Sequence, residues 1–303
     1  MRVVKGAIGA VLALMLTAGA ANAQTLDLSK PEDAFKAMRK IQCSTEDGKP
    51  GFYYWEGNAY SRLPNVERDR LLFRVVGMNV RACHSMVDEK RGPGARLVSR
   101  EIMLYLDPKT GEVLRSWTNP FTNETVEVLH VANDPVNNFM AMSARGGGAY
   151  QFPGKIAGPV MKMAIEVPLW YPNPLADSYQ KDIPNYQAVE LFNFFAQTSD
   201  LLDASKDWAP TATVSWARVA PWLPWMNMGG KDGALYFNAV GVRVAGFDDL
   251  PAVLKDEIRK TYPEYVGPPP ANDPRPNETS WTYYEKVMDQ RAGIKREPTP
   301  KKE

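Results

Sequence analysis

Apolar and polar side chains alternate along several stretches of this chain, and this period of two constrains the fold more than any other feature of the sequence. In the longest example, from Val160 to Leu169, every odd-numbered residue is Met, Ile, Val or Leu. Residues 71–75 and 126–130 repeat the pattern over shorter runs. Because successive side chains of a strand point to opposite faces of a sheet, this alternation predicts β-strands with one covered face.

The predicted fold is mainly β, α+β by content, with roughly ten to twelve strands in one antiparallel, barrel-like meander sheet. Short turns at residues 107–111 and 119–123 combine Pro with Asp or Asn, so residues 102–106, 113–117 and 125–131 are expected to be neighbouring strands. Closure or near-closure of the sheet would remove exposed strand edges and leave an interior that can hold a small molecule. A two-sheet β-sandwich is the alternative that periodicity leaves open.

About three helices are expected at the periphery of the sheet, covering or plugging its ends. Ser29 and Glu32 have the spacing of a capping box before a helix that reaches Ile41. A second helix is expected from Pro251 to before Pro263, and a third from about Thr282 to Arg291.

The chain divides into a signal peptide over residues 1–23, a single β-barrel-like domain with peripheral helices over residues 24–291, and a disordered tail over residues 292–303. A basic start, an apolar run and the small-x-small ending Ala21-Asn22-Ala23 predict cleavage between Ala23 and Gln24. No later segment is apolar enough to span a membrane, so we expect no membrane insertion and a periplasmic protein.

The net charge and the two cysteines indicate which kinds of partner and metal site this chain can have. Loss of Arg2 and Lys5 with the signal peptide leaves 34 of the 36 basic residues against 35 acidic ones, which argues against nucleic acid as a partner. Cys43 and Cys83 are expected either to form a disulfide in the oxidising periplasm or to remain as buried thiols. No pair among the cysteines and histidines has the spacing of zinc ligands, so no metal site is expected.

The segment from Trp208 to Gly230 is the best candidate for the wall of a ligand pocket. It holds four of the eight tryptophans and three prolines. Trp combines a large apolar face with one N–H donor, and Pro fixes the backbone that presents it. The ligand-binding candidates in this segment are Trp216, Arg218, Trp222, Trp225 and Asn227. Arg218 would hold a carboxylate or phenolate, and its alternative role is a structural cation–π contact.

Acid/base chemistry, if the chain performs any, is expected at His130 with Glu101 or Asp134 assisting. His130 follows the apolar face of a strand and leads into a polar run that includes Asn133. Tyr105 shares a strand face with Glu101 and completes the ligand-binding candidates. The structural alternatives are a buried His130 bonded to the backbone, a Glu101–Arg ion pair at the rim of the sheet, and turn formation by Asn133 and Asp134.

Four longer motifs stand out along the chain: Tyr105-Leu-Asp-Pro-Lys-Thr-Gly-Glu-Val113, Val128-Leu-His-Val-Ala-Asn-Asp-Pro-Val-Asn137, Pro221-Trp-Leu-Pro-Trp-Met226 and Pro276-Asn-Glu-Thr-Ser-Trp281. Together they resemble the bacterial DUF1838 family, whose members are exported proteins of undefined function. The motifs span most of the chain that follows the signal peptide. The resemblance implies no catalytic assignment.

The sequence therefore predicts an exported protein that binds a small, largely apolar, aromatic or acidic molecule in a Trp-lined cavity. Lyase, isomerase or hydrolase chemistry at His130 is one hypothesis; a non-catalytic periplasmic carrier and a structural protein with no ligand are the alternatives. No nucleotide-binding loop, G-x-S-x-G elbow or H-E-x-x-H motif occurs, so no cofactor is expected. The sequence gives no indication of the oligomeric state.

Overall fold

The computed structural model describes residues 24–144, 147–181 and 183–295. The expected signal peptide, residues 1–23, lies outside the described residues, as do residues 296–303 of the expected tail. The helices, including the short 3-10 helices η1 to η3, are α1 (Pro31–Gln42), α2 (Thr198–Leu202), η1 (Pro224–Met226), η2 (Phe247–Asp249), α3 (Ala252–Thr261), η3 (Pro263–Val266) and α4 (Ser280–Ala292). The strands are β1 (Gly51–Arg62), β2 (Arg70–Asp88), β3 (Gly92–Leu106), β4 (Ser116–Thr118), β5 (Thr125–Glu127), β6 (Val131–Asn133), β7 (Asn138–Ala141), β8 (Lys155–Ala157), β9 (Val160–Pro172), β10 (Asn185–Gln197), β11 (Thr213–Ala220) and β12 (Ala234–Val244).

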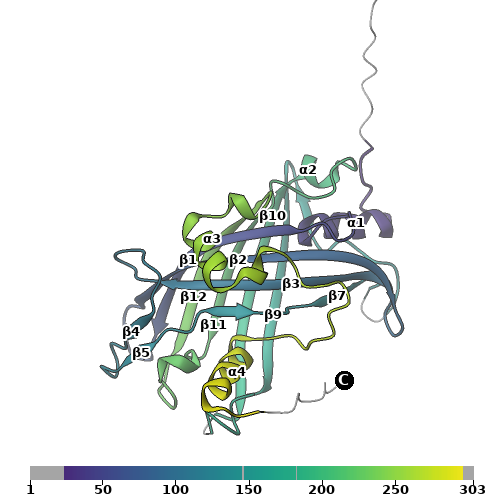
Figure 1. Cartoon of the computed structure of the whole chain (residues 1–303). Coiled ribbons are helices and arrows are strands. Elements are labelled where there is room, and N and C mark those ends of the chain that lie inside the picture. Colours follow the sequence, from purple (N-terminus) through teal and green to yellow (C-terminus); the bar gives the residue numbers. More distant parts are fainter. Residues whose placement is uncertain (1–23, 145–146, 182, 296–303) are drawn as a thin grey trace, which may run out of the picture.

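Ten of these strands form one antiparallel sheet, which confirms the predicted fold class (Figure 1). The strand order is β6-β3-β2-β1-β12-β11-β10-β9-β8, and β7 pairs with β3 beside β6. The sheet is not closed into a barrel, and the chain does not form the two packed sheets of a sandwich. Pairing of β1 with β12 joins the beginning of the fold to its late strands.

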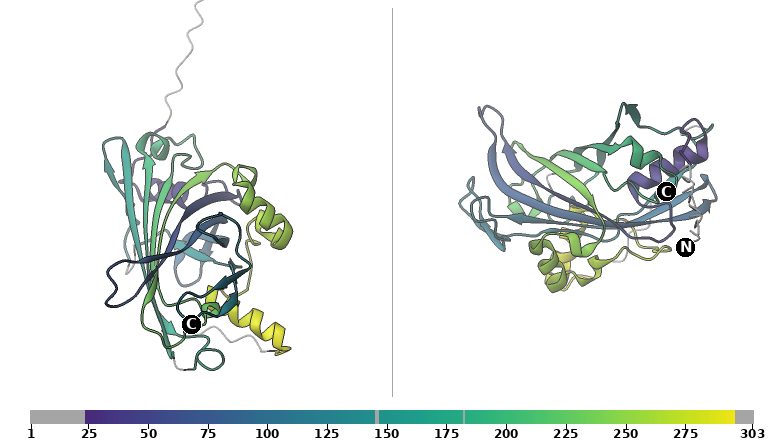
Figure 2. Two further views of the ribbon diagram at one scale, coloured as in Figure 1. Left: turned by 90° about the vertical axis from the view of Figure 1, so that its left-hand side faces the viewer. Right: turned by 90° about the horizontal axis from the view of Figure 1, so that it is seen from above.

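The sheet is strongly curled, as its two further views show (Figure 2). Strands β3 and β10 are five positions apart, which on a flat sheet would separate them by roughly 24 Å. Nevertheless Tyr105 of β3 and Tyr186 of β10 belong to one cluster of buried side chains. The face that carries both tyrosines is therefore concave, and we call it the concave face.

Glycines let neighbouring parts of the sheet approach closely where it bends. A Cβ at Gly77 would lie 2.6 Å from the ring of Trp55, which is directly opposite on β1. A Cβ at Gly57 would lie 2.1 Å from the carbonyl oxygen of Asn238 on β12. Since both distances are far below van der Waals contact, only glycine fits the curled sheet at these positions.

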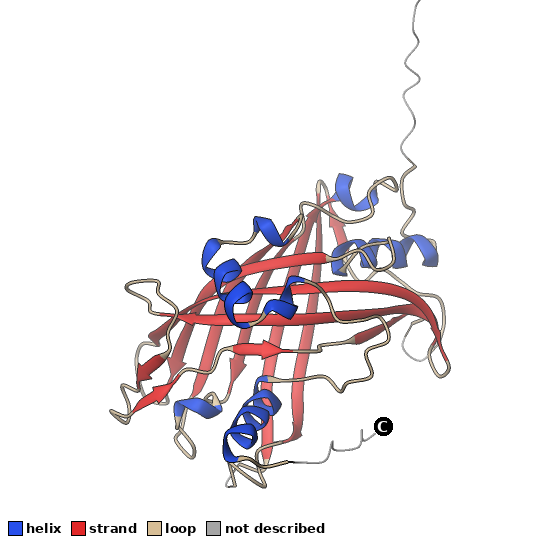
Figure 3. Cartoon of the chain, in the orientation of Figure 1, coloured by secondary structure: helices blue, strands red, loops and turns tan. Residues whose placement is uncertain are grey.

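The helices lie around the sheet, as the colouring by secondary structure shows (Figure 3). Ala37 and Ile41 of α1 pack on apolar side chains of the concave face at one end of the sheet. At the other end, η1 and α4 supply Trp225 and Trp281 to the buried cluster. Helix α3 covers the opposite, convex face through Leu254 and Ile258. Both ends of the concave face are thus covered, as the sequence predicted.

The structure differs from the sequence predictions in a few local details. The hydroxyl of Ser29 bonds to Asp27 instead of capping α1, which begins at Pro31. The last helix is capped by Thr279, whose side chain accepts from the backbone N–H of Thr282. Helix α2 was not predicted, because its five residues are too few to reveal a helical period.

The predicted meander after β3 is also only partly formed. Strands β4 and β5 pair with each other in a separate two-stranded ribbon, and the edge of the large sheet is extended by β6 instead. The ribbon turns away because Trp117 of β4 packs its ring on Phe73 and Trp225, which anchors it over the end of the concave face.

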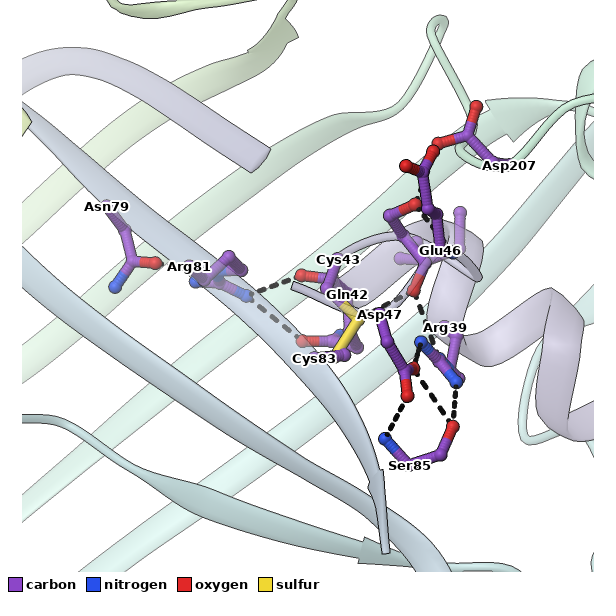
Figure 4. Close-up of a disulfide and its surroundings, with 12 residues drawn as sticks. Arg39, Gln42, Cys43, Glu46, Asp47, Asn79, Arg81, Cys83, Ser85 and Asp207 are labelled. Carbon is purple, nitrogen blue, oxygen red and sulfur yellow. Dashed lines mark hydrogen bonds and ion pairs between the residues drawn. A yellow bond between two sulfur atoms is a disulfide. The ribbon is translucent and has the colours of Figure 1, made fainter. Parts of the chain in front are cut away.

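A disulfide joins Cys43, which ends α1, to Cys83 of β2, with 5.9 Å between their Cα atoms (Figure 4). It closes a loop of 40 residues, for which the chain-entropy argument gives a stabilisation of about 4 kcal/mol. Arg39 reinforces the same joint, since its guanidinium donates to the Ser44 carbonyl and to the side chains of Asp47 and Ser85. Helix α1 is therefore fixed over its end of the sheet.

Candidate functional site

Polar side chains gather on the concave face between the two apolar ends. We call this group the concave cluster; it consists of Glu101, Tyr105, Asn133, Tyr186, Glu190 and Arg218. It draws on β3, β6, β10 and β11, so only the curl of the sheet brings its members together. Trp55 and Trp216 lie on the same face, on β1 and β11.

Arg218 is the centre of one half of the concave cluster. It is directly opposite Glu190 in the β10–β11 register, and its Nη1 lies 3.1 Å from a carboxylate oxygen of that residue. Its Nη2 donates to the hydroxyl oxygen of Tyr186 at 2.5 Å. Burial disfavours the charge, but Glu190 and Tyr186 outweigh burial and raise the pKa of Arg218. The guanidinium is therefore permanently charged.

Glu101 forms the other half with Asn133. The Asn133 side-chain amide donates to the carboxylate of Glu101 at 2.6 Å. Burial raises the pKa of Glu101, and the negative charge of Glu190 raises it further, whereas the bond from Asn133 and the charge of Arg218 oppose the shift. The pKa of Glu101 consequently lies above that of an ordinary glutamate.

Several buried polar atoms of this face make no hydrogen bond with any described residue. Besides Arg243 Nε, which lies toward α1, they are the Tyr105 hydroxyl, Arg218 Nε, Asn133 Oδ1 and the indole nitrogens of Trp55 and Trp216. Leaving one such group unsatisfied costs roughly 1–3 kcal/mol, so buried polar groups normally have partners. Five of them on one face indicate a place that water or a bound molecule completes.

Solvent reaches part of this region. The side chains of Arg218 and Glu190 each keep 20% of their accessible surface, although both lie on the concave face. Apolar side chains surround them, among them Phe192 and Phe237. The arrangement is a charged and hydrogen-bonding centre within an apolar, aromatic surround.

Two further arginines extend the positive charge toward α1. Arg81 and Arg243 both lie over the ring of Tyr53, at 5.4 and 5.2 Å from its centroid. Arg81 donates to the backbone and side-chain carbonyls of Gln42 and to Asn79 (Figure 4). Burial lowers the pKa of Arg81 to about 10.

The charge on the concave face is accordingly unbalanced. It carries three guanidinium groups and two carboxyl groups, one of which has a raised pKa. Since a buried charge without a counterion is costly, the excess suits a molecule with an acidic group.

His130 lies beside the concave cluster but is engaged by the backbone. It is 4% exposed, and its Nδ1 accepts the backbone N–H of Tyr105 at 3.2 Å. Burial lowers its pKa to about 4, and the nearby Arg115 contributes to the lowering. The neutral imidazole therefore holds the end of β3 in place and stacks on the Tyr105 ring at 6.0 Å.

Asp134 is separate from the other two predicted catalytic residues. Its carboxylate binds Arg100 at 2.8 Å and Arg275 at 2.9 Å. Arg100 lies on the convex face and also donates to the carbonyls of Glu264 and Gly267. Asp134 thus ties the segment after η3 to the outside of β3, and it does not reach His130 or Glu101 through any described hydrogen bond.

The tryptophan-rich segment divides between three places. Trp216 and Arg218 lie on the concave face, and Trp225 packs on Phe73 and Tyr105 in the buried cluster. Trp222 belongs to the same buried cluster and also lines a cavity of about 270 Å³ at the end of the sheet, together with Trp281 and with Tyr186 of the concave cluster. Asn227 lies outside, where its amide donates to Glu124 at 2.6 Å.

Sequence reasoning missed two members of the concave cluster, Glu190 and Tyr186. Glu190 interrupts an otherwise apolar strand face that contains Ala188 and Phe192. A single carboxylate at such a position is the signal that could have revealed it. No comparable signal marks Tyr186, because a tyrosine on an apolar strand face is ordinary.

Other classes of site have little support within residues 24–144, 147–181 and 183–295. No group of three or more His, Cys, Asp or Glu side chains there is arranged to hold a metal ion. The same residues contain no helix that is both long and apolar enough to cross a membrane. The sulfur atoms of Cys43 and Cys83 are used in their disulfide.

A family model matches most of this chain. The family model described as "Protein of unknown function (DUF1838)" matches residues 48–288, which include every member of the concave cluster. No curated protein matches the chain.

Proposed function

The chain belongs to the DUF1838 family, and we propose that it binds a small molecule with an apolar, aromatic body and an acidic head group on the concave face of its sheet. The observation that carries the proposal is the set of five buried polar atoms without partners around a charged arginine. A bound molecule would supply the missing hydrogen bonds, and the surrounding aromatic rings would cover its body.

Arg218 is the residue that would recognise the head group. Its Nε is free, and its other nitrogens are held by Glu190 and Tyr186, so the guanidinium is oriented before a ligand arrives. Such preorganisation lowers the entropic cost of binding. The Tyr105 hydroxyl and the indole N–H of Trp216 would donate alongside it.

The geometry favours a binding protein over an enzyme that uses His130. The Nδ1 atom of His130 accepts a backbone N–H, and Asp134 is committed to two arginines elsewhere. If a bound compound is converted, Glu101 is the group that would transfer a proton, because its pKa is raised and it lies in the concave cluster.

Tryptophan fluorescence tests the binding proposal, since Trp55 and Trp216 flank the concave cluster. Aromatic carboxylic acids and phenols are titrated into the purified protein, and quenching with micromolar to millimolar midpoints is expected for some of them. Tyr105→Phe should weaken the best compound about tenfold, because one hydrogen bond is lost. The same change should leave thermal stability equal or higher, since the hydroxyl has no partner among the described residues.

Two variants sharpen this experiment. Tyr60→Phe changes a tyrosine of β1 that contacts Tyr236, away from the concave cluster, and should not alter binding. Arg218→Gln combined with Glu190→Gln removes both charges together and should abolish the preference for acids over phenols. Two results would contradict the proposed head-group site. One is an unchanged affinity in Tyr105→Phe, and the other is a double variant that still prefers acids over phenols as strongly as the wild type does.

We further propose that the protein acts in the periplasm, after removal of residues 1–23. The disulfide between Cys43 and Cys83 supports this, because such bonds persist in oxidising compartments. Fractionation of expressing bacterial cells should recover the protein in the periplasmic fraction with Gln24 at its N-terminus, and recovery with an intact N-terminus in the cytoplasm would contradict it.

A further inference from the structure

A second cavity, of about 440 Å³, lies away from the concave cluster. It is bounded by the β2–β3 hairpin, the edge strand β7 and the extended segment that leads from η3 to α4, which run side by side in Figure 1. Arg91, Arg96 and Arg275 line it together with Met86, Asn137 and Phe139. The three guanidinium groups make the cavity rich in hydrogen-bond donors.

Arg91 is held in place by a platform of packed groups. Its guanidinium lies 4.2 Å from the centroid of the Phe139 ring. That ring occupies the space beside Gly94, where a Cβ would lie 2.6 Å from it. Arg91 also binds Asp88 at 2.7 Å, and this hydrogen bond lowers the pKa of Asp88 to about 2.

Arg96 is the arginine of this cavity that forms no ion pair with a described residue. One of its Nη atoms donates to the backbone carbonyl of Asp273, and no carboxylate of the described residues lies within 4.0 Å of its guanidinium. Arg275, by contrast, binds the carboxylates of both Asp273 and Asp134. The remaining donors of Arg96 are thus available to a ligand.

Asn137 adds a further donor without an acceptor. Its Oδ1 accepts the backbone N–H of Ser99, but its Nδ2 is buried and has no partner among the described residues. Asn277 cannot supply one, because it exchanges its own two hydrogen bonds with the backbone of Asn137. The cavity therefore has hydrogen-bond donors without acceptors, and a ligand that binds there should supply an acceptor.

The charge balance limits what that acceptor can be. The network holds four arginines and three aspartates, namely Arg91, Arg96, Arg100 and Arg275 with Asp88, Asp134 and Asp273. One positive charge is left over, and of the four arginines only Arg96 has no ion pair with a described residue. A single charge and a planar guanidinium fork match a carboxylate, which accepts two parallel N–H bonds.

We propose that this cavity binds the carboxylate group of a small molecule between Arg96 and Asn137, with a short apolar body against Phe139 and Met86. The site is independent of the concave cluster, since it shares no residue with it and lies beyond the β3–β7 edge. It is consequently expected to persist in Tyr105→Phe.

The test uses benzoate and its neutral isostere benzamide as probes of the mature protein labelled with ¹⁵N. The Arg96 Nε–H and Asn137 side-chain amide signals are followed during each titration, so binding is located at this cavity and not at the concave cluster. Saturable shifts are expected with benzoate and at least tenfold weaker ones with benzamide. Arg96→Gln should weaken benzoate binding at least tenfold, and Arg68→Gln, which removes an exposed arginine outside the lining, should not.

A second variant covers the case in which Arg96→Gln does not fold. Phe139→Leu removes the platform under Arg91 and should weaken benzoate binding several-fold while leaving the Arg96 contact to Asp273. Shifts that do not saturate, equal binding of benzamide, or binding of inorganic phosphate in place of benzoate would each overturn the assignment.

Discussion

His130 is an imidazole whose position is explained by the backbone bond that it accepts. The ring is buried and neutral, with a pKa of about 4, and its Nδ1 satisfies the N–H of Tyr105. In an unfolded chain the same imidazole titrates near pH 6.5. The folded protein therefore resists protonation that the unfolded chain accepts.

The stability of the fold should for that reason fall between pH 6.5 and pH 4. Across this window His130 becomes protonated in the unfolded state but not in the folded state. When this protonation is complete, the free energy of unfolding has fallen by about 3 kcal/mol. His130→Asn keeps an acceptor for the Tyr105 amide but does not titrate. Urea unfolding at pH 7 and pH 4.5 should show the variant losing less stability than the wild type. Equal losses would show that His130 is not held neutral.

For the individual site residues, the sequence predicted some positions correctly and others not. Arg218, Glu101 and Tyr105 were expected as site residues from strand faces, and Asn133 from the polar run after His130. All four lie in the concave cluster. Asp134 was expected beside His130, but a neighbouring arginine on the convex face attracts it. Pairing between charges depends on which strands become neighbours, and a single sequence does not contain that information.

At the scale of elements, strand faces were predictable and strand partners were not. The alternation over residues 160–169 gives the correct covered face of β9, with Met161 and Met163 buried. The contact of β1 with β12 joins segments some 180 residues apart, and nothing local specifies it. The curl likewise depends on close approaches at Gly57 and Gly77, which in the sequence look like ordinary strand-weakening glycines.

The approach at Gly77 can be measured directly. Gly77→Ala would place a methyl group 2.6 Å from the Trp55 ring and from the carbonyl oxygen of Ile102, so we expect a loss of roughly 1–3 kcal/mol in unfolding free energy. Gly246→Ala is the matched control, because a Cβ there meets no atom within 4 Å, and its effect should stay within about 0.5 kcal/mol. Chemical denaturation of both variants measures the two changes in unfolding free energy. Equal changes would show that the sheet tolerates a wider β1–β2 separation.

At the scale of the whole molecule, one sheet runs through the protein from edge to edge. Clusters of buried side chains lie on both of its faces, and both draw on β1, β2 and β3. The sequence predicted a single domain over residues 24–291. Shared strands make it hard for either face to lose its packing while the other remains intact.

Thermal unfolding of the oxidised protein should accordingly be a single cooperative transition. Calorimetric and van't Hoff enthalpies should agree, and near-ultraviolet and far-ultraviolet circular dichroism should give the same midpoint. Two separated transitions would contradict the prediction and divide the chain into units that fold apart.

The seating of Trp55 against Gly77 has a consequence for how this family can diverge. The indole fills the volume that any side chain at position 77 would need. A larger residue at position 77 therefore requires both a smaller ring at position 55 and a shift of β3 that moves the Ile102 carbonyl oxygen away. Because Trp55 also carries one of the free donors of the concave face, such a compensated pair would alter what the protein can hold, and relatives could acquire different ligands through two coupled mutations.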